Sequence, residues 1–159
     1  FVDVGGGSTE ITYHNKKKSV RESFNIGTIR YMMDEVSKDE WKRLKKWFAE
    51  HKLIDSSIPI LGSGGDINKI YKQQRRRNTD MHITTAGLRQ FYEQMKPLTY
   101  TERIIQYNLN PDRADVIIPA CEIFLSIIEL TSTKKIYVPK IGLSDGIVRS
   151  LYQEYLKKK

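Results

Sequence analysis

The chain has 159 residues, of which 39% are hydrophobic and 29% charged, which suits one packed domain with a solvated surface. No run approaches the ~20 apolar residues of a membrane span, and no basic-then-apolar leader is present, so a membrane or secreted protein is not expected. The single cysteine, Cys121, excludes an intramolecular disulfide, and we expect a cytoplasmic protein with a buried, inert thiol. The net charge of +8 favours a polyanionic partner such as nucleic acid or a phosphate polymer.

The first third of the chain predicts a β-meander followed by two helices. The residue pattern favours strands at residues 1–4, 10–13 and 19–24, with a hairpin turn at 15–17. Residues 29–36 are predicted to be helical. A further helix over residues 38–52 places Trp41, Leu44, Trp47 and Phe48 on one face.

The rest of the chain predicts short apolar strands that alternate with helices. We expect strands at 58–61 and 135–138, and helices at 67–74, from 84 or 85 to 95, 101–107, from 111 or 112 to 130, and from 144 or 145 to 157. This order predicts one α/β domain over residues 1–159, with a mixed, twisted sheet and helices on both of its faces. The chain opens with Phe1 inside a strand, so we expect a fragment whose N-terminal portion is missing.

The most informative segment is a glycine loop between the first two predicted strands. Asp3 ends the first strand, Gly5, Gly6 and Gly7 follow, and Ser8, Thr9 and Glu10 lead into the second strand. Consecutive glycines permit positive φ and let backbone amides gather around phosphate oxygens, while the two hydroxyls add donors. A carboxylate beside phosphates is favourable when Mg²⁺ lies between them. We therefore predict a phosphate site with Asp3 and Glu10 as metal ligands, against the alternative of a tight hairpin.

A second glycine segment, Gly62, Ser63, Gly64 and Gly65, follows another short strand and precedes a helix. A strand–loop–helix segment of this kind is typical of anion sites. Asp66 is interpreted as an N-cap rather than a catalyst. Neither segment is a Walker A or dinucleotide motif, and His14, His51 and His82 have no metal-ligand spacing.

The positive charge gathers in three runs, which are residues 16–18, 75–77 and 157–159. The last run is interpreted as a solvated tail. For Arg75, Arg76 and Arg77, a solvated turn and a phosphate contact are equally favoured. Arg30 is a further candidate for a phosphate contact, with pairing to Asp34 on its own helix as the alternative.

The blocks FVDVGGGSTEI, FNIGTIR, ILGSGGDINKI, NPDRADVIIPACEI and IGLSDGI, in this order, resemble the exopolyphosphatase/guanosine pentaphosphate phosphatase (Ppx/GppA) family. The resemblance implies a ribonuclease-H-like mixed sheet flanked by helices, as in the actin, hexokinase and Hsp70 superfamily. It implies the second lobe of a two-lobe enzyme that uses Mg²⁺ to hydrolyse the terminal phosphoanhydride of inorganic polyphosphate or guanosine pentaphosphate. It also leaves a homodimer of the full-length protein open.

The resemblance also implies roles for individual residues. Asp3 matches the metal-binding aspartate, residues 5–8 the phosphate loop, and Glu10 a second acidic residue for metal or water. Residues 62–65 match the second glycine loop, and Gly27 with Arg30 matches a recurring Gly-x-x-Arg. The family's water-activating glutamate belongs to the first lobe.

Two departures leave the substrate open. Asp66 stands where the family usually has threonine, and Ser144-Asp145 stands where Arg-Glu is frequent. Two alternative functions remain: a kinase-like ATP-binding lobe of the same superfamily, and a non-catalytic module that binds polyphosphate or nucleic acid.

Overall fold

The computed structural model describes residues 1–16, 18–74, 81–139 and 142–158. The basic run 75–77, part of the hairpin turn at 15–17 and the end of the basic tail lie outside the described residues. The elements in chain order are β1 (Val2–Val4), β2 (Thr9–His14), β3 (Ser19–Phe24), α1 (Thr28–Met32), α2 (Lys38–Glu50), β4 (Ile60–Ser63), α3 (Gly65–Gln74), β5 (His82–Thr84), α4 (Thr85–Met95), α5 (Tyr100–Tyr107), α6 (Pro111–Ala114), α7 (Ile117–Thr131), β6 (Lys135–Tyr137) and α8 (Leu143–Lys157).

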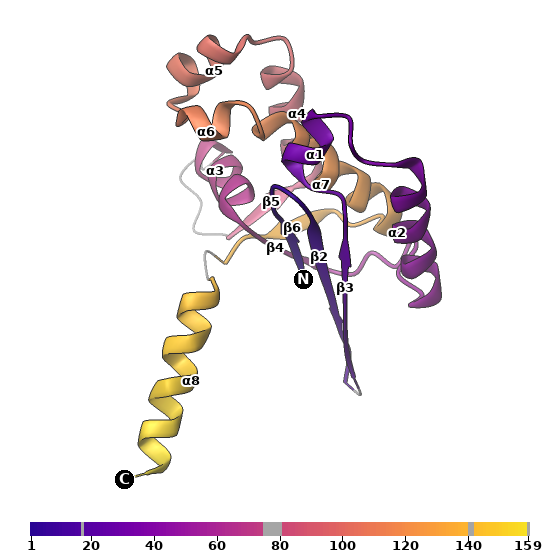
Figure 1. Cartoon of the computed structure of the whole chain (residues 1–159), viewed down its shortest axis with the longest axis vertical. Helices are drawn as coiled ribbons and strands as arrows, with labels where there is room; N and C mark the ends of the chain where they lie inside the picture. The colour runs from indigo at the N-terminus through magenta and orange to yellow at the C-terminus, as the bar shows by residue number, and fades with distance from the viewer. Residues whose placement is uncertain (17, 75–80, 140–141, 159) are drawn as a thin grey trace.

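A six-stranded mixed sheet in the order β3-β2-β1-β4-β6-β5 forms the centre of the molecule (Figure 1). Strands β1, β4 and β6 run parallel, whereas β2 and β3 form an antiparallel meander with β1. The predicted mixed α/β sheet is thereby confirmed. The strand β5 was not predicted, because its three residues lie beside a helix start and carry no alternation long enough to detect.

One face of the sheet packs against the hydrophobic core. Val2, Val4 and Ile11 alternate with exposed or half-buried residues and are nearly fully buried. Helix α7 packs against this face and is buried along most of its length, as its apolar run predicts. Cys121 on α7 is fully inside the core, and burial raises the pKa of its thiol, which agrees with the predicted inert cysteine.

The opposite face of the sheet is open, and the prediction of helices on both faces is wrong for the described residues. Asp3, Arg21 and Ser23 on this face are exposed, and the larger side chains of Leu61 and Tyr137 are each 40% exposed. The physical reason is the alternation in β1–β3, which places polar residues on every second position. Helix α8 points away from the rest of the molecule in Figure 1 and does not cover this face.

Several predicted boundaries move. The first helix ends at Met32 instead of residue 36, because Asp34 takes a left-handed backbone conformation (φ 57°). The predicted helix of residues 111–130 is two helices, since Pro119 has no N–H to donate to the carbonyl of Asp115. No helix in the described ranges combines the length and the apolar character needed to cross a membrane.

Candidate active site

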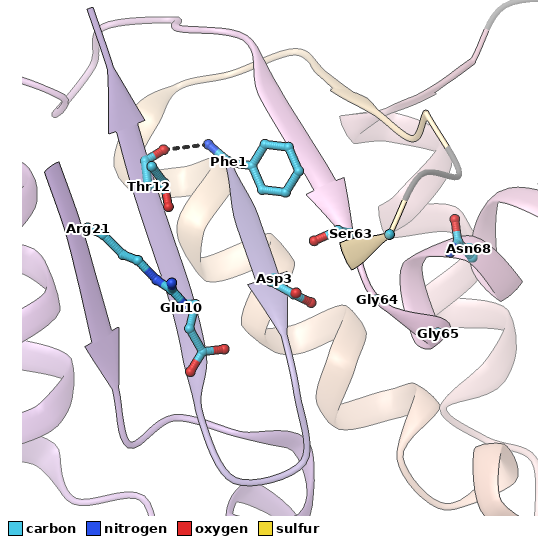
Figure 2. A pocket seen from close by; sticks show the side chains of 10 residues that line it. Phe1, Asp3, Glu10, Thr12, Arg21, Ser63, Gly64, Gly65 and Asn68 are labelled. Atoms are coloured by element: carbon cyan, nitrogen blue, oxygen red, sulfur yellow. Dashed lines mark hydrogen bonds between the residues drawn. The ribbon is translucent and has the colours of Figure 1, made fainter. Parts of the chain in front are cut away.

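Asp3 and Glu10 lie side by side on the open face of the sheet (Figure 2). The two residues are direct partners in the antiparallel register of β1 and β2, so their side chains leave the sheet on the same face. The same row continues to Ser23 of β3 and to Ser63 of β4. Residues as distant in the sequence as Ser23 and Ser63 are thus aligned across four neighbouring strands.

The glycine loop of residues 5–8 holds the Glu10 carboxylate in place. One oxygen, Oε1, accepts hydrogen bonds from Ser8 Oγ at 2.6 Å and from Ser23 Oγ at 3.0 Å. The other oxygen, Oε2, has no hydrogen-bond partner among the described residues. Glu10 therefore offers one free oxygen in a fixed direction. The Ser8 hydroxyl, which was predicted to bind phosphate, instead donates its hydrogen bond to Glu10.

The carboxylates of Asp3 and Glu10 line a cleft of about 550 Å³. Its lining residues come from the open face, from the turn into α3 and its first residues, and from the start of α8, and they are Phe1, Asp3, Glu10, Thr12, Arg21, Ser63, Gly64, Gly65, Asn68 and Gly142 (Figure 2). After β1 the chain turns back into β2, whereas after the neighbouring parallel strand β4 it continues into α3. The crevice between two connections that diverge in this way, called a topological switch point, is where open α/β sheets bind ligands. The tertiary structure thus brings the carboxylates that flank the first glycine segment together with Gly64 and Gly65 of the second, while Gly5 and Gly6 line a neighbouring hollow.

The second glycine segment divides into residues that pack and residues that line the cleft. Gly62 lies inside β4 and faces the core, where an added Cβ would come within 2.9 Å of Ile136 Cγ2. Gly62 is not among the residues that line the cleft, and its lack of a side chain is explained by packing. Gly64 has φ 107°, and an added Cβ there would lie 3.1 Å from Asp3 Oδ1, so the turn requires glycine beside the carboxylate.

Two buried polar atoms of this region have no hydrogen-bond partner in the described part of the chain. They are Ser63 Oγ and Asn68 Oδ1, and both residues line the cleft. A buried polar group without a partner costs about 1–3 kcal/mol, so these atoms indicate a site that a ligand or water completes. Asn68 was missed by the sequence analysis, although its place one helical turn after Gly65 was a usable signal.

Asp66 is not an N-cap. It lies in the first turn of α3, is only 4% exposed, and pairs with Arg113 at 3.0 Å. Burial raises the pKa of Asp66, and the neighbouring Arg113 guanidinium opposes that shift. Arg113 also packs over Gly65 and lines a second hollow of about 380 Å³ next to the cleft. The sequence analysis missed this cation because it is 47 residues from Asp66.

Three further predictions about the first glycine loop need correction. Gly64 is the only described glycine with positive φ, so Gly5, Gly6 and Gly7 do not use that freedom. The Thr9 hydroxyl is fully buried and donates to the carbonyl of Ile26 instead of facing a ligand. Arg30 donates from Nε to the Gly7 carbonyl at 2.8 Å and lies 3.8 Å from Glu35, not Asp34.

The donor set of the cleft fits Mg²⁺. No group of three or more His, Cys, Asp or Glu side chains gathers to hold a metal in the described ranges. Mg²⁺ commonly takes one or two carboxylates and completes its shell with water and substrate phosphate. Asp3 and the free oxygen of Glu10 supply such a pair. His14, His51 and His82 are not among the described residues that line the cleft.

The sheet order, with the carboxylate pair beside the junction of β1 and β4, defines a mixed α/β fold that the chain shares with solved phosphatase structures. The chain belongs to the Ppx/GppA phosphatase family, whose model matches residues 1–155. No curated protein matches the chain.

Solved structures with the same fold include the Aquifex aeolicus Ppx/GppA phosphatase, type II variant, at 23% identity and TM-score 0.73. That similarity covers 94% of this chain and 55% of the Aquifex chain. A Cytophaga hutchinsonii exopolyphosphatase is similar at 20% identity and TM-score 0.71, over 96% of this chain and 56% of the other. This chain therefore spans little more than half the length of these proteins.

Proposed function

We propose that the chain supplies the metal-binding and phosphate-binding half of an enzyme that hydrolyses the terminal phosphoanhydride of inorganic polyphosphate or guanosine pentaphosphate. The observation that carries this proposal is the Asp3–Glu10 pair, fixed in register on the open face beside the turn at Gly64. Membership of the phosphatase family supports the proposal, as does similarity to a protein named an exopolyphosphatase. The buried single cysteine is consistent with a cytoplasmic location.

The residues of the cleft divide the work as follows. Asp3 and Glu10 hold Mg²⁺, which when bound neutralises charge on the phosphates and polarises a water. The unpartnered Ser63 hydroxyl can donate to a phosphate oxygen, whereas Asn68 Oδ1 is an acceptor and can take a hydrogen bond from a water in the cleft. Arg21 adds a positive charge at the rim of the cleft. Together these groups bind and orient a phosphate chain, which is most of what phosphoryl transfer asks of a protein.

We further propose that a second lobe completes the site. The relatives' chains extend well beyond the part that this chain matches, and the cleft opens on an uncovered sheet face. The water-activating glutamate that the family resemblance implies would belong to that lobe. The 159-residue chain is therefore expected to bind phosphate chains but to turn them over slowly.

The test is a titration of the 159-residue chain with tripolyphosphate, with and without Mg²⁺. Mg²⁺ should tighten binding of tripolyphosphate by the wild type. Asp3→Asn should reduce this gain in affinity by a factor of roughly ten or more, which corresponds to about 1.4 kcal/mol. Without Mg²⁺ the variant should bind as well or better, because a repulsive carboxylate is gone. Asp39→Asn, an equally conservative change at an exposed site on α2, is the control and should change nothing.

A folded Asp3→Asn chain that keeps the full Mg²⁺ effect would remove Asp3 from the metal site. Circular dichroism establishes that the variant is folded. A wild-type preference for ATP over tripolyphosphate would instead favour the kinase-like alternative.

A further inference from the structure

The first turn of α1 donates hydrogen bonds to the carbonyl oxygens of the first glycine loop. The amide of Thr28 donates to Gly5 O at 2.9 Å, and the amide of Ile29 donates to Gly6 O at 2.9 Å. The next carbonyl, Gly7 O, accepts from the Arg30 side chain through Nε at 2.8 Å. Three successive carbonyls of the loop are therefore turned toward α1.

This arrangement dictates where the loop's amides point. In a trans peptide the C=O of one residue and the N–H of the next point in opposite directions. The amides of Gly6, Gly7 and Ser8 consequently face away from α1, and none of them has an acceptor among the described residues. Free amides on one side of a short loop are the donors with which a backbone binds phosphate oxygens.

We infer that Arg30 is a positioning residue, which orients the loop's last free amide, and not a phosphate contact. This rests on the proposed phosphate-binding function, with the backbone amides of residues 5–8 as donors, as the sequence predicts. The guanidinium is already committed, since Nε bonds Gly7 O and Nη1 lies 3.8 Å from Glu35 Oε2. The planar guanidinium of arginine can point one N–H group at the Gly7 carbonyl and another at the Glu35 carboxylate, which the single ammonium group of lysine does not reproduce.

Gly27 provides the space in which the first glycine loop packs against the start of α1. A Cβ on Gly27 would lie 2.3 Å from Gly6 O and 2.4 Å from Ser8 N, so only glycine lets the loop approach. Its φ of −126° is open to any residue, so the need is for space, not for conformation. The Gly-x-x-Arg spacing therefore has one physical explanation: Gly27 admits the loop and Arg30, one turn later, fastens its end.

The experiment compares Arg30→Met, Arg30→Lys and the control Arg89→Met in the 159-residue chain. Arg89 is an exposed arginine that pairs with Glu129, so its loss removes the same charge away from the loop. Tripolyphosphate affinity is measured over a range of salt concentrations. Both Arg30 variants should bind at least about tenfold more weakly at every salt concentration, with the wild-type slope of log affinity against log salt. The control should bind like the wild type.

A second readout needs no ligand. The amide resonances of Gly7 and Ser8 in the NMR spectrum of the free chain should move in both Arg30 variants and stay in place in Arg89→Met.

The inference is overturned if Arg30→Lys keeps wild-type affinity while Arg30→Met lowers the salt slope by somewhat under one, as the loss of one phosphate-bound cation does. It is also overturned if the amide resonances stay in place in both Arg30 variants. If the wild type binds no tripolyphosphate, the proposed function fails, and the resonances still decide whether Arg30 orients the loop.

Discussion

The ion pair of Asp66 and Arg113 shows how one residue shapes the edge of the cleft. Asp66 is almost fully buried, whereas Arg113 is 37% exposed and lies over Gly65. A buried carboxylate is costly unless a cation and hydrogen bonds offset its desolvation. Asp66 thus holds the Arg113 cation next to the proposed phosphate site.

Removing the cation should expose the cost of the buried carboxylate. Arg113→Met should destabilise the chain at pH 7 by about 1–3 kcal/mol, less than a fully buried pair because Arg113 is partly solvated. In this variant the folded-state pKa of Asp66 lies further above its unfolded value of about 3.9. The loss is therefore complete above the folded pKa and disappears as the pH falls toward the unfolded value.

Urea unfolding of wild type and variant at pH 7 and near pH 4.5 measures this difference. The double variant Asp66→Asn/Arg113→Met is the control, because it has no carboxylate to titrate. An equal loss at both pH values would show that packing, not charge, explains the effect.

At the scale of the element, the position of β4 separates structural glycines from glycines of the site. The strand ends at Ser63, two residues later than predicted, so Gly62 belongs to the sheet and faces α3 and α7. An added Cβ would crowd Ile136 on the neighbouring strand and Ile67 on α3. Gly62 thus allows the two helices to lie close to the strand.

We expect Gly62→Ala to cost roughly 1–3 kcal/mol of stability through overpacking, with unchanged affinity of the folded chain for tripolyphosphate. Gly7→Ala is the matched stability control, because nothing lies within 4 Å of its added Cβ. Thermal unfolding and a titration below the melting temperature separate the two effects. Weaker binding by folded Gly62→Ala would return Gly62 to the phosphate site.

For the whole molecule, exposed apolar side chains at two places among the described residues indicate where the proposed second lobe packs. One is the open sheet face with Leu61 and Tyr137, and the other is the side of α8 that carries Ile147, Val148, Leu151 and Tyr152. Gly142, immediately before α8, lines the cleft. A lobe that covers α8 would therefore also border the candidate active site.

Leu151→Ser tests this packing. In the 159-residue chain it should change stability by no more than about 0.5 kcal/mol, because Leu151 is 60% exposed. In a longer protein that contains the second lobe, the same change should cost about 1–3 kcal/mol of lost burial. Gln153→Ser, on the opposite side of α8, should be neutral in both proteins. Equal small effects of Leu151→Ser in both would show that α8 stays uncovered.

Much of the fold could be predicted because its signals are local. The alternation in the first three strands, the helical periodicity of α2 and the apolar run of α7 each lie within one stretch of chain, and each element formed close to its predicted place. The short strand β5 and the break before α7 were missed, because a three-residue strand and a single proline carry little pattern.

The sequence by itself determined the α/β class, the family resemblance and the closeness of Asp3 to Glu10, since a hairpin places neighbours in sequence side by side. Only the tertiary structure decided that Ser63 lies beside Asp3, that Arg113 pairs with Asp66, and that Gly27 and Arg30 grip the first glycine loop. These contacts join residues far apart in the chain, and they depend on strand order and on the space left by absent side chains. Local pattern carries no information on either, because both are set by how the finished elements pack.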